Sequence, residues 1–331
     1  MKRVAGVLLP ILFTFALLVY ALWDVDRTKL WSILVQGQLW VVPPFVLLLF
    51  LFFLVNAQRW TRLLAPFGRY SPRQVAPAMM IGFAANNVLP LRIGEIIRAV
   101  IFAKEFAHSR TGVLMTLVVE RALDLVGILL IFSVGVLLVG EVPIAFKISL
   151  IAALAGVGML MFVLILLARL PWITARLWTW ISQYVPAVVA SRGQVYLEEF
   201  GRGIEVLGSL RATVSLFLQS LLRWGMAAAL VWLSLASYGV FASLGLAMIV
   251  VGVTAVAVSL PSVPGYIGPV QAAFVFALVP FGISQEEALA ASIFFLIGHW
   301  VPITFTGAVY FVSRHYSYRQ IRREAAAMDD L

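Results

Sequence analysis

Two stretches with the pattern Leu-Pro-x-x-x-Gly, residues 89–94 and 260–265, interrupt long apolar segments of the sequence. Proline removes a backbone hydrogen-bond donor and glycine frees the backbone to turn, so each stretch predicts a broken helix. The surrounding chain is 63% hydrophobic and 12% charged, whereas typical soluble domains carry about 25% charged residues. In a bilayer, a broken helix is tolerated only where protein or a polar cavity covers its free backbone groups. The breaks therefore predict a polar site inside a polytopic membrane protein.

The remaining apolar stretches have the length that crosses a bilayer. We expect an all-α integral membrane protein with six transmembrane helices, at residues 4–23, 39–57, 111–139, 144–168, 212–239 and 287–313. The segments 75–106 and 245–282 contain the breaks, and each fits a re-entrant helical hairpin better than one clean crossing.

Basic residues in the short loops predict the orientation, because cytoplasmic loops carry an excess of Lys and Arg. Both termini and the loop 58–73, which contains Arg59 and Arg62, are expected in the cytoplasm of a bacterial-type inner (plasma) membrane. The basic segment 169–211 is also expected there, either as interfacial amphipathic helices or as a packed connector. In this arrangement residues 1–140 and 141–331 form one domain with an inverted repeat, which predicts a substrate site near the midplane and alternating access.

Several functional classes lack support in the sequence. There is no cysteine, and the three histidines are too scattered for a metal-ligand cluster, so we expect neither a metal nor another cofactor. No G-x-x-x-x-G-K-[ST] loop is present, so we do not expect ATP to be used by this chain. The net charge of +9 resides near the membrane spans, which favours anionic lipid over nucleic acid as the partner.

The first break carries charged residues at membrane depth, where charges are costly and often functional. Two arginines beside a helix N-terminus could hold a phosphate, and neighbouring amides could add hydrogen bonds. The alternative is that Glu95 and Arg98 only pair to hold the hairpin. The candidate substrate-binding residues here are Asn86, Asn87, Arg92, Glu95 and Arg98, next to the break residues Pro90 and Gly94.

The second break is neutral and offers hydroxyl, amide and free backbone groups. Its candidate binding residues are Ser262 and Gln271, and its break residues are Pro261, Pro264, Gly265 and Gly268. The alternative is an ordinary extracytoplasmic loop.

Span 111–139 contains Glu120, Arg121 and Asp124. The two carboxylates are four residues apart and share one helix face. Arg223, deep in span 212–239, is the most economical partner. These four residues could form a coupling network that relays protons, or a buried structural ion network.

The patterns N-x-L-P-x-R-x-G-E-x-x-R, E-R-x-x-D and L-P-S-x-P-G-x-x-G resemble the lysylphosphatidylglycerol synthase transmembrane-region family over nearly the whole chain. The resemblance implies a flippase fold with two re-entrant hairpins that moves phospholipid or glycolipid headgroups. Family members often have Glu where Gln271 stands, and the soluble aminoacyl-transferase domain is absent, so synthesis of lysyl-phosphatidylglycerol is not expected. The matching residues are Asn87, Leu89, Pro90, Arg92, Gly94, Glu95, Arg98, Glu120, Arg121, Asp124, Pro261, Pro264, Gly265 and Gly268.

The sequence is compatible with three functions. The first is a lipid transporter, not an enzyme, with membrane lipids as ligands and lipid-synthesis enzymes as candidate partners. The second is an integral-membrane glycosyltransferase using a polyprenyl-linked sugar, for which Asp24 and Asp26 could hold a divalent metal. The third is a non-catalytic subunit of a lipid-synthesis complex, which would tolerate loss of Arg92.

Overall fold

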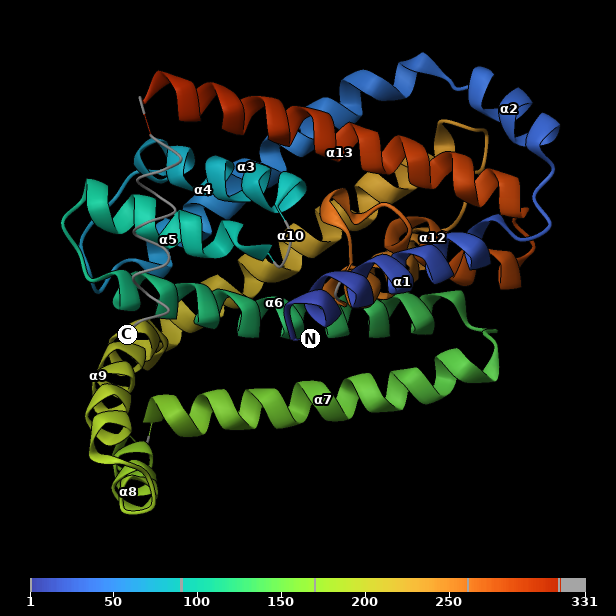
Figure 1. Cartoon of the computed structure of the whole chain (residues 1–331). Helices are drawn as coiled ribbons and strands as arrows, with labels where there is room; N and C mark the ends of the chain where they lie inside the picture. The colour runs from blue at the N-terminus through green and yellow to red at the C-terminus, as the bar shows by residue number, and fades with distance from the viewer. Residues whose placement is uncertain (1, 90–91, 170, 261, 315, 317–331) are drawn as a thin grey trace.

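The computed structural model describes residues 2–89, 92–169, 171–260, 262–314 and 316, and every regular element in those ranges is helical (Figure 1). Short 3-10 turns connect some of the helices: η1 (Leu39–Val41), η3 (Glu205–Gly208), η4 (Pro264–Tyr266) and η5 (Val279–Phe281). The α-helices are α1 (Lys2–Leu22), α2 (Arg27–Val35), α3 (Val42–Leu63), α4 (Pro72–Val88), α5 (Gly94–Glu105), α6 (Arg110–Val139), α7 (Ile144–Arg169), α8 (Pro171–Ser182), α9 (Ala187–Ile204), α10 (Leu210–Ala236), α11 (Leu244–Ser259), α12 (Pro269–Leu278) and α13 (Gln285–Ser313).

Six stretches of the described chain are long and apolar enough to cross a membrane. They are Leu39–Leu63, Arg110–Val139, Ile144–Val163, Leu210–Ala236, Pro264–Phe281 and Gln285–Ser313. Five of them overlap predicted spans. The sixth, Pro264–Phe281, is built from η4, α12 and η5 and so is not one continuous helix. The predicted span 4–23 corresponds to α1, whose stretch Pro10–Leu22 is a shorter apolar helix.

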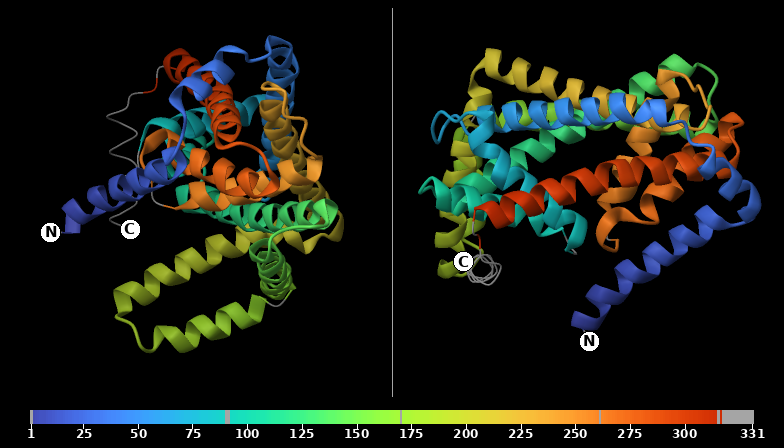
Figure 2. Two further views of the ribbon diagram at one scale, coloured as in Figure 1. Left: turned by 90° about the vertical axis from the view of Figure 1, so that its right-hand side faces the viewer. Right: turned by 90° about the horizontal axis from the view of Figure 1, so that it is seen from above.

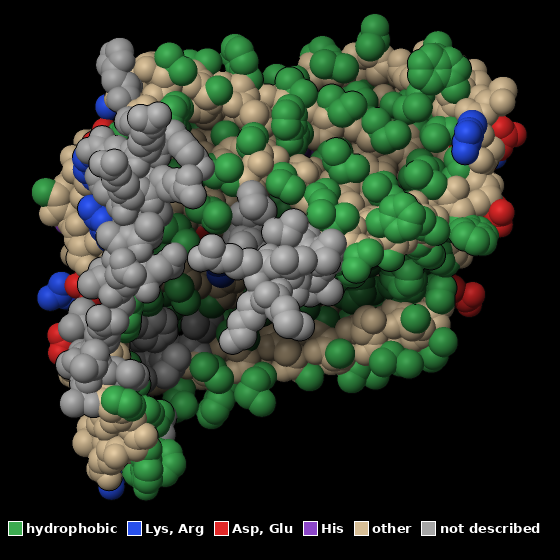
Figure 3. Space-filling view, in the orientation of Figure 1, with side chains coloured by type: hydrophobic (Ala, Val, Ile, Leu, Met, Phe, Trp, Pro, Cys, Tyr) green, Lys and Arg blue, Asp and Glu red, His purple; other side chains and the backbone are tan. Residues whose placement is uncertain are grey.

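The surface has the polarity of a membrane-embedded bundle. In the face shown in Figure 3, hydrophobic side chains cover the middle, and charged side chains gather toward the two ends of the long helices. Large apolar side chains such as Phe50 on α3, Ile151 on α7 and Phe305 on α13 are exposed. Apolar exposure on this scale marks a surface that contacts lipid or another protein.

The first predicted break is present. Helix α4 ends at Val88 and α5 begins at Gly94; Pro90 lies outside the described residues. Tyr70, just before α4, contacts Phe102 near the end of α5, so the chain folds back on itself. Gly94 is required at the crossing, because a Cβ atom there would lie 2.0 Å from the carbonyl oxygen of Gly82.

The second predicted break is also present, between α11 and α12, with Pro261 outside the described residues. Gly265 and Gly268 have φ angles of +85° and +94°, which L-residues with side chains rarely adopt. Helix α1 covers this break: the Oγ1 atom of Thr14 accepts a hydrogen bond from the Val263 amide at 3.1 Å, and a Cβ on Gly268 would lie 3.1 Å from the Thr14 carbonyl oxygen. Figure 2 shows α1 beside α12, with its N-terminal end extending away from the bundle.

The segment 169–211 forms α8 and α9 at one end of the molecule, and α9 packs on α6. Helix α7, which leads to it, lies along α6 with little of its surface covered by the rest of the bundle (Figure 2). The segment is therefore helical, and its position at the cytoplasmic membrane interface stays a prediction.

One boundary was predicted wrongly. The span 39–57 was expected to end in a cytoplasmic loop containing Arg59, but α3 continues to Leu63 and the Arg59 side chain is fully buried. The physical reason is an acidic partner on α6, Asp124, which stabilises the buried Arg59 charge. The rule that basic residues mark cytoplasmic loops assumes that such a charge is exposed to water.

Candidate functional site

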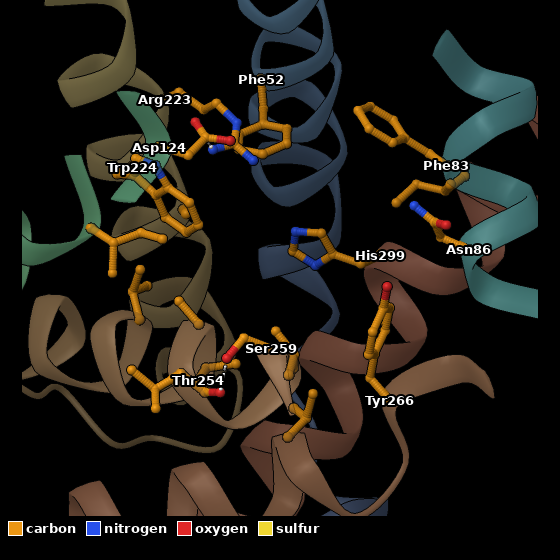
Figure 4. A pocket seen from close by; sticks show the side chains of 18 of the residues that line it. Phe52, Phe83, Asn86, Asp124, Arg223, Trp224, Thr254, Ser259, Tyr266 and His299 are labelled. Atoms are coloured by element: carbon orange, nitrogen blue, oxygen red, sulfur yellow. Dashed lines mark hydrogen bonds and ion pairs between the residues drawn. The ribbon is translucent and has the colours of Figure 1, made fainter. Parts of the chain in front are cut away.

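A cavity of about 440 Å³ lies between the two helix breaks (Figure 4). Helices α3, α4, α5, α6, α10, α11, α12 and α13 contribute to its wall, together with Arg92 and Tyr266 in the two breaks. Its polar and charged lining residues include Asn86, Asn87, Arg92, Glu95, Arg121, Asp124, Arg223, Thr254, Ser259, Tyr266 and His299.

Apolar and aromatic side chains form the rest of the wall, among them Phe52, Phe83 and Trp224. Figure 4 shows Asp124, Arg223 and Trp224 on one side and Phe83 with Asn86 on the other. Charges inside such a wall interact more strongly than in water, because the effective dielectric constant is lower.

Asp124 is the centre of a buried ion network. Its Oδ1 atom accepts hydrogen bonds from Arg59 at 2.5 Å and from Arg223 at 2.9 Å, and its Oδ2 atom lies 3.4 Å from Arg121. The sequence predicted Arg223 as the partner of the carboxylates Glu120 and Asp124, and in the structure it binds Asp124. Arg59 also donates to Ser220 on α10 at 2.9 Å, so this group connects α3, α6 and α10.

Glu120, one turn earlier on α6, is held behind the cavity wall. Arg98 donates to its two carboxylate oxygens at 3.2 and 3.0 Å, and Arg59 approaches it at 3.4 Å. The Arg98 guanidinium also stacks over the Trp60 ring at 3.7 Å. Both Arg98 and Glu120 are buried, so bidentate pairing and the aromatic face replace the water that each charge has lost.

Glu95 lies at the cavity surface and is bound to Arg121 at 2.9 Å. It is 4.0 Å from Arg98, one turn along α5, so the expected Glu95–Arg98 contact exists but is the longer of the two. Glu95 therefore connects the first break to the ion network on α6.

Arg92 connects the two breaks. Its guanidinium donates to the carbonyl oxygen of Val258, in the last turn of α11, where the helix dipole favours a positive charge. Arg92 has a φ angle of +53°, and Tyr266 in the second break has +59°. Left-handed conformations of residues with side chains are strained and concentrate at functional sites. Here both line the same cavity.

Asn87 attaches the first break to α13. Its amide nitrogen donates to the hydroxyl of Thr304 at 3.0 Å, and the Trp300 indole donates to its carbonyl oxygen at 3.4 Å. Asn87 therefore fixes the end of α4 to α13 through both its side chain and its backbone carbonyl.

Several buried polar atoms of the cavity wall make no hydrogen bond within the described part of the chain: Asn86 Oδ1, Glu95 Oε2, Asp124 Oδ2, Trp224 Nε1 and Thr254 Oγ1. Buried polar atoms nearly always have a partner in proteins. The set includes acceptors and a donor, beside the arginines, so the cavity can bind a ligand that carries both anionic oxygens and hydrogen-bond donors.

The structure divides the predicted site residues into three groups. Asn86, Asn87, Arg92, Glu95, Arg121, Asp124 and Arg223 line the cavity, whereas Arg98 and Glu120 lie behind its wall. Ser262 and Gln271 are not among the lining residues. Gln271 is buried and its Oε1 atom accepts from the Gly268 amide at 2.7 Å, so it caps α12.

Sequence reasoning missed Arg59, Thr254, Tyr266 and His299. A signal existed for two of them. Asn56 and Arg59 continue the buried face of α3 at helical spacing, and His299 is an ionisable residue inside an apolar span. Thr254 and Tyr266 carry no comparable signal, because their place in the cavity depends on how the second break folds.

One of the two acidic residues proposed for a metal, Asp26, has another role. The Asp26 carboxylate accepts from the amides of Thr28 at 2.8 Å and Lys29 at 3.1 Å, so it caps α2. Among the described residues, no group of three or more His, Cys, Asp or Glu side chains could hold a metal ion.

A family model described as "Lysylphosphatidylglycerol synthase TM region" matches residues 7–307. No curated protein matches the chain.

Proposed function

The chain belongs to the lysylphosphatidylglycerol synthase TM region family, a membrane domain associated with lipid handling, and from this premise we propose that it is a flippase. It would move a phospholipid or glycolipid headgroup between leaflets by alternating access. The observation that carries the proposal is the arginine-lined cavity between the two helix breaks. Its volume of about 440 Å³ falls in the usual range of ligand pockets, roughly 300–1,000 Å³.

In this proposal the helix pairs α4–α5 and α11–α12 are re-entrant hairpins of an inverted repeat, and their breaks meet near the bilayer midplane. Residues 1–140 and 141–331 would be the two repeats. Both termini and α8–α9 would be in the cytoplasm of the inner membrane. Membrane-depth breaks that line a cavity are the usual construction of a transporter site.

The headgroup phosphate would contact Arg92 in the first break and Arg121 on α6. Asn86 and Glu95 would accept hydrogen bonds from hydroxyl or amine groups elsewhere in the headgroup. Each of these residues lines the cavity. Arg98 and Glu120 would keep the wall in place, since they bind each other through two hydrogen bonds.

The test is lipid exchange in vesicles that contain the purified chain. A short-chain fluorescent phosphatidylglycerol is loaded on the inner leaflet, and albumin outside extracts each molecule that crosses. Arg92→Ala and Glu95→Gln should each slow exchange by about tenfold or more, because a hydrogen bond to a charged group contributes about 1.5–3 kcal/mol.

Arg62→Ala is the matched control, because Arg62 is exposed and its guanidinium donates to Ser215 away from the cavity. It should exchange lipid at the wild-type rate. Wild-type exchange by the folded Arg92→Ala/Glu95→Gln double variant would refute the proposed site. No exchange by the folded wild type above that of protein-free vesicles would instead favour the subunit of a lipid-synthesis complex.

A further inference from the structure

His299 on α13 is a cavity residue that the proposed headgroup contacts do not use. Figure 4 shows its ring directed into the cavity, with the Tyr266 side chain directed toward it. The ring packs on Phe295, with 4.3 Å between ring centroids, and edge-on against Phe45 at 5.5 Å. Its Nδ1 atom lies 3.0 Å from the Phe295 carbonyl oxygen.

This contact decides which ring nitrogen is available. A carbonyl oxygen can only accept, so Nδ1 carries a hydrogen and donates it to Phe295. Nε2 of the neutral ring is then an acceptor, and it can take up a proton without breaking the Nδ1 hydrogen bond.

The carboxylates of the cavity are poorly suited to carry a proton. Arg59, Arg121 and Arg223 all contact Asp124, and Arg121 is bound to Glu95 at 2.9 Å. Protonating Asp124 would leave the buried Arg59 and the largely buried Arg223 without this counter-charge, which costs several kcal/mol. Protonating Glu95 would break its ion pair with Arg121. Of the described residues that line the cavity, His299 is the only one whose side chain ordinarily titrates between pH 5 and 8.

We propose that His299 is a proton-binding site that couples headgroup movement to protons. The inference rests on the flippase function proposed above and names the coupling ion for the same cavity. Uptake forms an Nε2–H bond with a proton from water on one side of the membrane. Release breaks that bond and returns the proton to water on the other side, with no electron transferred.

The charges around His299 predict the direction of coupling. The ionisable groups that share the cavity with it are Arg92, Glu95, Arg121, Asp124, Arg223 and Tyr266. With Tyr266 neutral, three arginines face two carboxylates, so the lining already has one positive charge in excess. A proton on His299 adds a second, and a bound phosphate offsets it.

Coupling between two ligands is reciprocal. An anionic headgroup therefore favours proton uptake by His299, and the proton favours the headgroup. Both would bind in the same conformation and cross in the same direction.

The experiment measures exchange of the fluorescent phosphatidylglycerol in vesicles held at pH 5.5 or pH 8.0 on both sides. Two variants remove the titration while keeping different contacts. His299→Gln retains an N–H that can donate to Phe295, and His299→Phe retains an aromatic ring against Phe295 and Phe45. His108→Gln is the matched control, because His108 lies between α5 and α6, outside the cavity.

The wild type and His108→Gln should exchange lipid at least about fivefold faster at pH 5.5 than at pH 8.0, given the usual size of ligand coupling. For each His299 variant, the exchange rates at the two pH values should differ by less than about twofold. An acidic compartment on the loaded side should accelerate export by the wild type and by His108→Gln, but not by either His299 variant. A wild-type pH ratio in both His299 variants, or a wild-type rate that does not change with pH, would overturn the coupling site while leaving the flippase proposal intact. No exchange by folded wild-type protein at either pH would instead overturn the flippase proposal itself.

Discussion

The buried Arg59 provides a test of the bundle itself. Its side chain has no exposed surface and contacts Asp124 at 2.5 Å, Ser220 at 2.9 Å and Glu120 at 3.4 Å. Removing one partner of a buried ion pair typically costs about 3–5 kcal/mol, because the other charge stays behind without compensation. We therefore expect Arg59→Ala to lower the free energy of unfolding by about 3–5 kcal/mol.

Arg62, one turn further along α3, is the comparison. Its side chain is exposed and donates to Ser215, so Arg62→Ala should change the free energy of unfolding by less than about 1 kcal/mol. Arg59→Lys should fall between the two alanine variants, since lysine keeps the charge but not the planar set of donors. Unfolding in mixed micelles with increasing SDS, followed by tryptophan fluorescence, gives the three free energies. If Arg59→Ala and Arg62→Ala lost the same stability, the buried network would not hold α3 against α6.

Two further predictions concern the first break and the topology. Gly94→Ala should sharply reduce the yield of monodisperse protein, since its Cβ would lie 2.0 Å from the Gly82 carbonyl oxygen. Gly158→Ala should leave the yield unchanged, because no atom lies within 4 Å of the added Cβ. Size-exclusion chromatography measures both yields. The chain has no cysteine, so single-cysteine variants give a clean label. A membrane-impermeant maleimide should label Ser32→Cys on α2 in intact cells and Gln183→Cys after α8 only when the membrane is opened, and the reverse result would invert the proposed orientation.

The helix breaks could be predicted from the sequence because their cause is local. Proline and glycine restrict or free the backbone wherever they occur, so the ends of α4 and α11 follow from a few adjacent residues. The pairing of Asp124 with Arg223 was also predictable, since two opposite charges at membrane depth have few alternatives.

The rest depends on contacts that the local sequence does not contain. Arg59 was assigned to a loop by its charge, but Asp124, 65 residues away, makes its burial favourable. Gln271 was expected in the site, and its side chain instead satisfies the Gly268 amide three residues earlier. A side chain near a helix N-terminus can bind either a ligand or a backbone amide of its own helix. The conformation of the break determines which of the two it reaches.

The hydrogen bond between Thr14 and Val263 has a consequence for biosynthesis. The two residues are 249 positions apart, and Gln285, which donates to the carbonyl oxygens of Ala21 and Trp23, is made later still. Chains emerge from the ribosome N-terminus first, so α1 enters the lipid long before the region that covers it has been translated. Its docking is therefore among the last steps of assembly, and a nascent chain truncated before residue 263 would leave the first helix without this anchor.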